Sequence, residues 1–401
     1  MRIALVAQHV TPLTTGNTAD RGQANESRLR ELSRSLASNG HRVTVYARRH
    51  GSTPERTELE RGVTVEYIGP ADGRADHFAE ADLLRQVPEF SRPLHERWRA
   101  ERPDVVHAVR WTSGLAALAA ARDLRIPVVQ TFDSLGVAER RHHVMAQSAG
   151  VERIRLEPAI GRSASAVVAG SSDEQTDLAR LGVPRRHIRV VPCGIDTDEF
   201  TPEGPVAERG TRPRLVTIAD LSEYDALANL LHAISKVPGT DLVVAGGPPR
   251  EELRSDLNFR RLAKLAGTLG ISGQVAFAGQ TSRAALPPLL RSADLLVNVS
   301  EYDPSGITSI QAMACGTPVI ASAAGGQADA VLDGTTGIVV PPGRPALLAQ
   351  RIRQLLGHPM MLEAFSVAAA DRARSRYSWD RIAVETIAVY DTARDAAAMA
   401  A

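Results

Sequence analysis

Short apolar runs recur along the chain and are separated by segments that read as loops or helices. The first run, IALVA at residues 3–7, predicts a short buried strand. A segment rich in Thr, Gly and Asn at 11–23 predicts a loop, followed by a helix at about 24–39 and a second strand at 42–46. This strand–helix–strand order predicts a parallel sheet with a right-handed crossover.

The same pattern continues through the chain with one interruption, a Pro-rich and charged stretch at 201–213 (TPEGPVAERGTRP) that predicts a linker. Before it, further strands are predicted at 63–68, 105–108, 128–131, 166–169 and 188–191. After it, the pattern restarts with strands at 215–218, 241–245, 274–278, 295–299, 319–321 and 337–340.

This organisation predicts two doubly wound, Rossmann-like α/β domains, at 1–200 and 214–378, with a ligand cleft between them. The Ala-rich segment 379–401 predicts a long amphipathic helix. Its apolar side is expected to carry Ile382, Val384, Ile387 and Tyr390.

The loop after the strand at 295–299 is the strongest candidate for a functional site. The apolar run at 293–300 leads through a Pro-Ser-Gly turn into a short helix that ends at Gly316, with Pro318 just beyond. A helix that begins directly after a glycine loop presents free backbone N–H groups and the positive end of its dipole. The segment therefore predicts an anion-binding site.

The composition is that of a globular protein, and it does not identify a reaction or a substrate. The 401 residues are 43% hydrophobic and 23% charged, with a net charge of +1, which gives no reason to expect a nucleic acid as partner. Cys193 and Cys315 lie in apolar contexts and predict buried thiols. Because no apolar run reaches spanning length and Met1 leads directly into a strand, we expect a cytoplasmic protein without a transmembrane segment.

Several segments share a pattern with a known family: RGQANESRLRELSRSLASNGHRVTVYARR (21–49), VVQTFDSLG (128–136), VVPCGIDTDEFTP (190–202), LVVAGGPP (242–249), DPSGITSIQAMACGTPVIAS (303–322), AAGGQADAVLDGTTGIVVPP (323–342) and RYSWDRIAVETIAVY (376–390). Together they resemble the retaining glycosyltransferases of the GT-B fold, family 4, of the type common in actinomycetes.

The resemblance implies an enzyme that transfers a sugar from a nucleotide-diphosphate sugar to a small-molecule acceptor. Secondary-metabolite or glycoconjugate biosynthesis is the expected setting. It further implies that the C-terminal domain binds the nucleotide sugar, that the N-terminal domain binds the acceptor, and that helix 379–401 crosses back to the N-terminal domain. The loops at 9–22 and 70–100 are expected to recognise the acceptor.

The sequence departs from the family at the polar positions of the implied site. Asp220 and Asp225 stand where the family has Arg and Lys, which stabilise the departing diphosphate. Asp303 and Gln311 stand where it has two glutamates, and Asp133 where it has a histidine. Asp133, Asp303 and Gln311 are the implied catalytic residues; Asp220 and Asp225 would repel a diphosphate.

The remaining implied positions lie in loops and at a helix N-terminus. In the first Gly-Gly pair of the N-terminal loop, Arg21 replaces the first glycine and Gly22 remains. The other residues expected to contact the donor are Gly246, Gly247, Pro304, Ser305, Gly306, Ile307 and Thr308.

Three interpretations of the altered site remain open. In the first, the donor site is rebuilt: Arg21 takes over part of the phosphate contact, or Asp220, Asp225 or Asp303 holds Mg²⁺, although the family needs no metal. In the second, the protein uses a donor without a diphosphate or a cationic substrate such as an aminocyclitol. In the third, catalysis is lost and the protein is a binding partner or activator of an active homologue. The expected protein partners are such a homologue or a second copy of the chain in a homodimer.

Overall fold

The computed structural model describes residues 1–8, 21–49, 54–69, 80–142 and 150–399, leaving out the side chains of 21–26 and 80–83. The chain forms two compact units. Unit 1 contains the N-terminal strand, Arg21–Pro192 and Trp379–Ala401, and unit 2 contains Cys193–Ser378.

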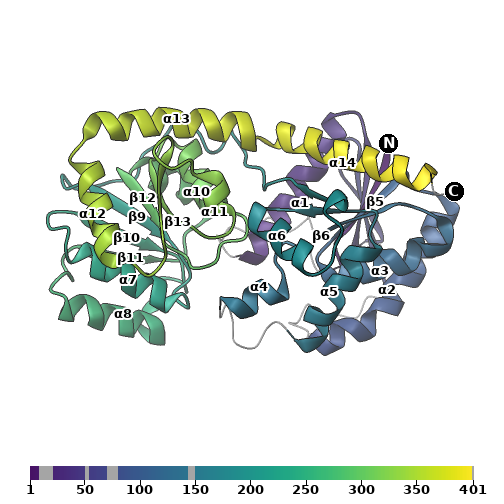
Figure 1. Ribbon diagram of the computed structural model, residues 1–401, viewed down its shortest axis with the longest axis horizontal. Coiled ribbons are helices and arrows are strands. Elements are labelled where there is room, and N and C mark those ends of the chain that lie inside the picture. Colours follow the sequence, from purple (N-terminus) through teal and green to yellow (C-terminus); the bar gives the residue numbers. More distant parts are fainter. Residues whose placement is uncertain (9–20, 50–53, 70–79, 143–149, 400–401) are drawn as a thin grey trace. The chain divides into compact units, whose positions relative to one another are not determined.

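The described strands of unit 1 form one sheet in the order β3-β4-β2-β1-β5-β6-β7-β8 (Figure 1). Every pairing is parallel except that of β3 with β4, which is antiparallel. The strands are β1 (Arg2–Val6), β2 (Arg42–Arg48), β3 (Arg56–Glu60), β4 (Val63–Ile68), β5 (Val105–Val109), β6 (Val128–Thr131), β7 (Ala166–Ala169) and β8 (Ile188–Val190).

Helices cover both faces of this sheet, so its strands read as continuous apolar runs. Leu36 of α1 and Tyr390 of α14 belong to the core on one face, whereas Trp98 of α2 and Ala117 of α3 belong to the core on the other. The helices of unit 1 are α1 (Arg21–Ser38), α2 (Glu80–Ala100), α3 (Trp111–Ala121), α4 (Gly136–Arg141), α5 (Val151–Ser163), α6 (Ser172–Arg180) and α14 (Trp379–Met399).

Unit 2 has a six-stranded parallel sheet in the order β11-β10-β9-β12-β13-β14. Its strands are β9 (Arg214–Ile218), β10 (Asp241–Ala245), β11 (Val275–Gly279), β12 (Leu295–Asn298), β13 (Val319–Ser322) and β14 (Gly337–Val340). Its helices are α7 (Tyr224–Ile234), α8 (Leu257–Thr268), α9 (Leu286–Arg291), α10 (Ile307–Ala314), α11 (Gly326–Ala330), α12 (Pro345–Leu356) and α13 (Pro359–Tyr377).

The helices of unit 2 also cover both sheet faces. Leu230 of α7 and Ile352 of α12 belong to the core on one face. Leu290 of α9 and Ile310 of α10 belong to the core on the other. The parallel order and the two covered faces confirm the predicted Rossmann-like α/β class.

Helix α14 is held in unit 1 by a buried polar contact as well as by apolar packing. The Tyr390 hydroxyl lies 2.7 Å from Nδ1 of His107 in β5, and both side chains are buried. The prediction that Val384 shares the apolar side with Ile382 was wrong, because Ile382 is 3% exposed and Val384 is 52% exposed. Two residues span about 200° on a helix, so these side chains point in opposite directions.

Three further expectations about local structure were wrong. Strand β3 was not predicted, because its sequence RTELE is mostly polar and its pairing is at the sheet edge. Helix α1 begins at Arg21, about three residues before the predicted helix start at 24. Residues 80–100 form helix α2 where a loop was expected, with Pro88 and Pro93 inside it. Residues 9–20 and 70–79, the rest of the expected acceptor loops, lie outside the described residues.

Candidate functional site

The strand order of unit 2 reverses at β9, which pairs with β10 on one side and β12 on the other. In a doubly wound sheet, the loops at the carboxyl ends of such strands diverge and leave a crevice in which ligands bind. Asp220 follows β9, and Asp303 follows β12. The topology therefore places the loops that contain these two predicted residues at one edge of the sheet.

The loop after β12 is folded around the carboxylate of Asp303. Its Oδ1 accepts hydrogen bonds from the backbone N–H of Ser305 at 3.2 Å, from Oγ of Ser305 at 3.2 Å and from the backbone N–H of Gly306 at 2.8 Å. Because Oδ1 alone accepts these three bonds, Oδ2 is left for a ligand. Asp303 thus positions the loop that leads into α10.

Glycines bring this loop into backbone contact with the loop after β13. The N–H of Gly326 donates to the carbonyl of Asp303 at 2.9 Å. A Cβ added to Gly306 would lie 2.6 Å from the carbonyl carbon of Gly326, and one added to Gly326 would lie 2.5 Å from that of Ser305. Gly306 also has φ of 65°, which non-glycine residues rarely adopt. The two loops therefore form one rigid edge.

Helix α10 starts from this edge without a side-chain cap. Its N-cap is Gly306, which has no side chain to accept a bond from the first turn. The N–H of Ile307 donates to Oγ of Ser305 at 3.3 Å, whereas the next N–H groups of that turn and the positive end of the helix dipole are available to an anion. Around them, Pro304, Ser305, Ile307, Thr308 and Gln311 are half-buried, which keeps them within reach of a ligand.

Gly246 and Gly247 allow the end of β10 to approach the end of β9. Their φ angles are 118° and 84°. A Cβ on Gly246 would collide with the carbonyl oxygen of Ala219, and one on Gly247 would lie 2.6 Å from Cγ of Leu221. This close packing accounts for both glycines without a ligand, and their predicted contact with the donor stays a prediction.

The two acidic residues at the family's cationic positions each have a local structural role. Oδ1 of Asp220 accepts the backbone N–H of Ser222 at 2.7 Å and closes the turn after β9. Asp225 lies in the first turn of α7, where a carboxylate interacts favourably with the helix dipole. Both side chains are exposed, so both are free to meet a ligand.

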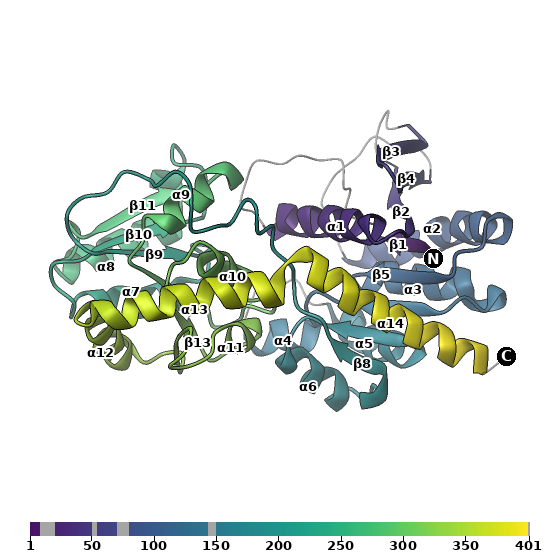
Figure 2. The same ribbon diagram turned by 90° about the horizontal axis from the view of Figure 1, so that it is seen from above.

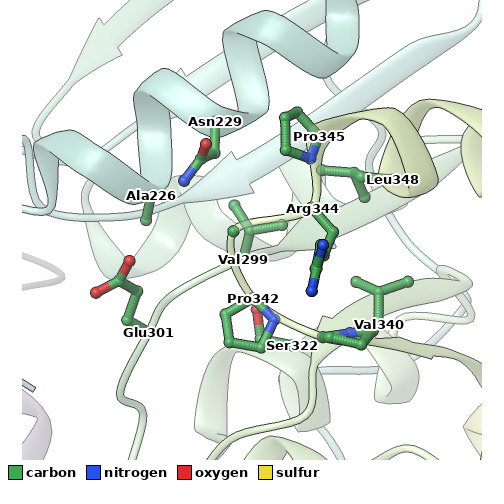
Figure 3. Close-up of a pocket in the computed structure, with 12 residues that line it drawn as sticks. Ala226, Asn229, Val299, Glu301, Ser322, Val340, Pro342, Arg344, Pro345 and Leu348 are labelled. Atoms are coloured by element: carbon green, nitrogen blue, oxygen red, sulfur yellow. The ribbon is translucent and has the colours of Figure 1, made fainter.

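A cation that sequence reasoning missed lies at the same sheet edge. Arg344 is the N-cap of α12 and lines a narrow crevice with Ala226, Glu301 and Ser322 (Figure 3). The free volume of this crevice, about 10 Å³, is close to the space that one water molecule needs. The Ser322 hydroxyl is fully buried and has no hydrogen-bond partner within the described ranges.

The position of Arg344 is unfavourable for the stability of α12. An N-cap normally carries an oxygen that accepts a backbone N–H, and its loss costs about 1 kcal/mol. A cation at the positive end of a helix adds repulsion. An Arg-Pro pair directly before an apolar helical run is the sequence signal that could have identified this residue.

In unit 1, Asp133 lies just beyond β6 in a left-handed conformation, with φ of 65°. Its Oδ1 accepts a hydrogen bond from Arg28 of α1 at 2.7 Å. Its Oδ2 is buried and has no hydrogen-bond partner in the part of the chain that the structure describes. Sequence reasoning missed Arg28, because only the fold brings α1 to the end of β6.

Arg21 and Gly22 open α1, but their side chains lie outside the described residues.

Glu174 is a second buried acid in the same region. Its Oε2 accepts the backbone N–H of Gly170 at 2.7 Å, while Oε1 is buried without a partner among the described residues. Burial raises the pKa of the Glu174 carboxyl to about 7, the Gly170 N–H opposes this shift, and the negative charge of Asp133 adds to it. Unit 1 therefore holds two acids with unused oxygens near one arginine.

The raised pKa of Glu174 predicts a pH-dependent loss of stability. Between pH 4.5 and about 7 the unfolded chain releases this proton and the folded chain retains it, so the free energy of unfolding falls as pH rises. The total loss is at most about 3 kcal/mol. Replacing Glu174→Gln should remove this contribution, which melting temperatures measured from pH 4.5 to 8 would reveal.

The control is Glu152→Gln, an exposed acid in the first turn of α5. It should leave the pH dependence of the melting temperature unchanged. An identical pH profile for wild type and Glu174→Gln would show that Glu174 is ionised in the folded protein throughout this range.

Within the described ranges, no group of three or more His, Cys, Asp or Glu side chains is placed to hold a metal ion. Asp220, Asp225 and Asp303 accordingly form no ready-made Mg²⁺ site there. None of the described helices is both long enough and apolar enough to cross a membrane.

Two family models match the chain, one to each half. Residues 26–199 match the family described as Glycosyltransferase Family 4, and residues 202–372 match Glycosyl transferases group 1. A D-inositol 3-phosphate glycosyltransferase of Streptomyces bingchenggensis is 32% identical over 97% of this chain and 89% of its own length. D-inositol 3-phosphate glycosyltransferase 2 of Catenulispora acidiphila is 30% identical over 97% of this chain and 94% of its own.

Solved structures agree with the fold. A sucrose-phosphate synthase from Thermosynechococcus elongatus superposes with a TM-score of 0.82 at 25% identity, covering 98% of this chain and 99% of that one. Anabaena HepE in complex with UDP and glucose superposes with a TM-score of 0.70 at 19% identity, covering 97% of this chain and 98% of that one.

Proposed function

Because the chain belongs to glycosyltransferase family 4, we propose that it transfers a sugar from a nucleotide-diphosphate sugar to a small polyhydroxylated acceptor. The protein is a glycosyltransferase of the GT-B type, with two Rossmann-like units. We further propose that unit 2 binds the donor and unit 1 the acceptor.

One feature of unit 2 carries this proposal: the uncapped N-terminus of α10 beside the joined loops that contain Asp303 and Gly326. The N–H of Gly326 and the packing of Gly306 fix these loops by backbone contacts, so a phosphate group can bind without reorganising them. Stabilisation of the negative charge that grows on the departing diphosphate is the main catalytic requirement of this reaction.

The charges around this site suggest how the donor is held despite Asp220 and Asp225. Arg344 is exposed at the same sheet edge, and a guanidinium binds phosphate oxygens through two N–H groups. We assign it the part that the family gives to its Arg and Lys. Gln311 would bind ribose hydroxyls. In unit 1, Oδ2 of Asp133 would accept a hydrogen bond from a hydroxyl group of the acceptor.

The acceptor is proposed by analogy with the relatives. Those named above are D-inositol 3-phosphate glycosyltransferases, which suggests a cyclitol or a cyclitol phosphate as acceptor and a role in glycoconjugate or secondary-metabolite biosynthesis.

The test is direct. The full-length protein is incubated with UDP-, GDP- or ADP-sugars and either D-inositol 3-phosphate or myo-inositol, and products are identified by mass spectrometry. One donor–acceptor pair should yield a glycosylated cyclitol together with the free nucleoside diphosphate. Calorimetric titration with UDP and GDP, with and without Mg²⁺, tests donor binding separately. Absence of both product and nucleotide binding would contradict the proposal.

A second candidate is favoured by the exposed acids Asp220, Asp225 and Glu301 at the sheet edge of unit 2. Carboxylates there suit a cationic substrate, such as an aminocyclitol or an aminosugar, better than a diphosphate. Tighter calorimetric binding of an aminocyclitol than of myo-inositol, without nucleotide binding, would support this candidate. The reverse order would exclude it.

A further inference from the structure

A second cavity lies in unit 1, at the other edge of its sheet from Asp133. It has a volume of about 200 Å³ and is lined by Ser165, Ala166, Arg186, His187, Arg189, Val389, Thr392 and Ala396. Ser165 and Ala166 stand at the start of β7, and Arg186 and His187 directly precede β8. Because the strands are parallel, this amino-terminal edge is separate from the carboxyl ends, where Asp133 follows β6.

The cavity is bounded on its other side by α14. Val389, Thr392 and Ala396 lie three or four residues apart and so share one face of that helix. Figure 2 shows α14 beside β8. A molecule bound here would contact both α14 and the segment that leads into β8.

The polar groups of the cavity favour an anion. Its lining residues include two arginines and a histidine but no carboxylate. Nη1 of Arg189 donates hydrogen bonds to the carbonyl oxygens of Arg186 at 3.0 Å and of Ile188 at 3.1 Å. These bonds fix the Arg189 side chain and leave its Nε and Nη2 groups for a ligand. Nδ1 of His187 is buried and has no hydrogen-bond partner within the described residues.

The size and walls of the cavity define the ligand further. A volume of about 200 Å³ is below the range of about 300–1,000 Å³ that is usual for ligand pockets, so the cavity suits a ligand smaller than a nucleotide sugar. Two guanidinium groups match the oxygens of one phosphate, and the Ser165 hydroxyl adds a further donor. The Thr392 hydroxyl already donates to the carbonyl of Ala388 at 2.9 Å, so its oxygen can only accept. Ala166, Val389 and Ala396 provide an apolar wall for a short carbon chain.

We propose that this cavity binds a small organic phosphate at a site distinct from that of sugar transfer. The ligand joins the turn before β8 to α14. Since α14 follows α13 of unit 2 with only Ser378 between them, binding stabilises the segment through which the chain returns to unit 1. Binding of the organic phosphate is expected whichever sugar donor and acceptor the protein uses.

The experiment titrates the full-length protein with glycerol 3-phosphate by calorimetry at constant ionic strength, with glycerol and sodium chloride as ligand controls. Wild type should bind glycerol 3-phosphate and neither control. Arg186→Gln should bind it at least tenfold more weakly, because one of the two cations is lost. Arg185→Gln is the matched control: it removes an exposed arginine from the same turn, and this residue does not line the cavity.

A second variant leaves the arginines of the cavity unchanged and fills its volume. Ala396 is exposed on α14, so Ala396→Phe should fold, fill the cavity and abolish binding. Saturating UDP should leave the titration with glycerol 3-phosphate unchanged. Equal affinities in wild type, Arg186→Gln and Ala396→Phe, or competition by UDP, would overturn the proposal.

Discussion

Replacing Gly326→Ala should lower the rate of sugar transfer by on the order of 100-fold, because it displaces the loop that leads into α10. The added Cβ would lie 2.5 Å from the carbonyl carbon of Ser305 and 2.7 Å from the nitrogen of Gly306. Both are backbone atoms that cannot rotate away, so the loops must separate. Overpacking of this kind also costs about 1–3 kcal/mol of stability, which a lower melting temperature would report.

Gly273→Ala is the matched control in the same unit. Gly273 has no positive φ, and nothing lies within 4 Å of an added Cβ, so both the rate and the melting temperature should stay at wild-type values. If Gly326→Ala behaves like this control, Gly326 does not pack against the backbone of Ser305 and Gly306 in the folded protein. A lower melting temperature with an unchanged rate of sugar transfer would show that the packing of these loops is not needed for catalysis.

The double replacement Asp220→Arg with Asp225→Lys should tighten the binding of UDP or GDP by on the order of 100-fold. It changes the charge near the proposed diphosphate site by four units. At about 6 Å, a unit charge interacts with another by about 0.7 kcal/mol in water and about 3 kcal/mol at an effective dielectric constant of about 20. Both side chains are exposed, so the lower figure applies, giving about 3 kcal/mol in total.

Calorimetric titration with the nucleotides measures this effect. Glu363→Arg with Asp371→Lys supplies the same change in net charge on exposed positions of α13, and it should alter nucleotide affinity little at physiological ionic strength. An affinity unchanged by the double replacement at Asp220 and Asp225 would mean that these residues do not face the diphosphate. A similar gain in both double variants would indicate a general electrostatic effect.

Most strands could be predicted because both faces of each sheet are covered. Runs such as 166–169 (AVVA) and 337–340 (GIVV) are apolar throughout, which marks a buried parallel strand, and the structure has strands with these same bounds. Strand β3 lies at an edge and has no such run. Helix α2 was missed because Pro88 and Pro93 interrupt its pattern, although apolar residues such as Leu94 and Trp98 still reach the core.

The loop after β12 could be recognised from sequence, but two cations, Arg28 in unit 1 and Arg344 in unit 2, could not. The loop at 303–306 is recognisable because strand, turn and helix follow one another along the chain. Arg28 and Asp133 pair although they lie 105 positions apart in the sequence. Arg344 lies at the carboxyl edge of the sheet because it follows β14, which pairs with β13. Local sequence therefore identified the acidic positions and Arg21, but it did not identify Arg28 or Arg344.

Family, fold class and the position of the α10 loop follow from the chain alone, since apolar periodicity and local motifs encode them over a few residues at a time. The partners of the polar side chains depend on contacts between distant segments. These contacts show that Asp303 folds its loop, that Asp220 closes a turn and that Asp133 is paired with a half-buried arginine, Arg28. They also create the cationic cavity between β8 and α14, because a sheet edge and a terminal helix meet only in the folded protein.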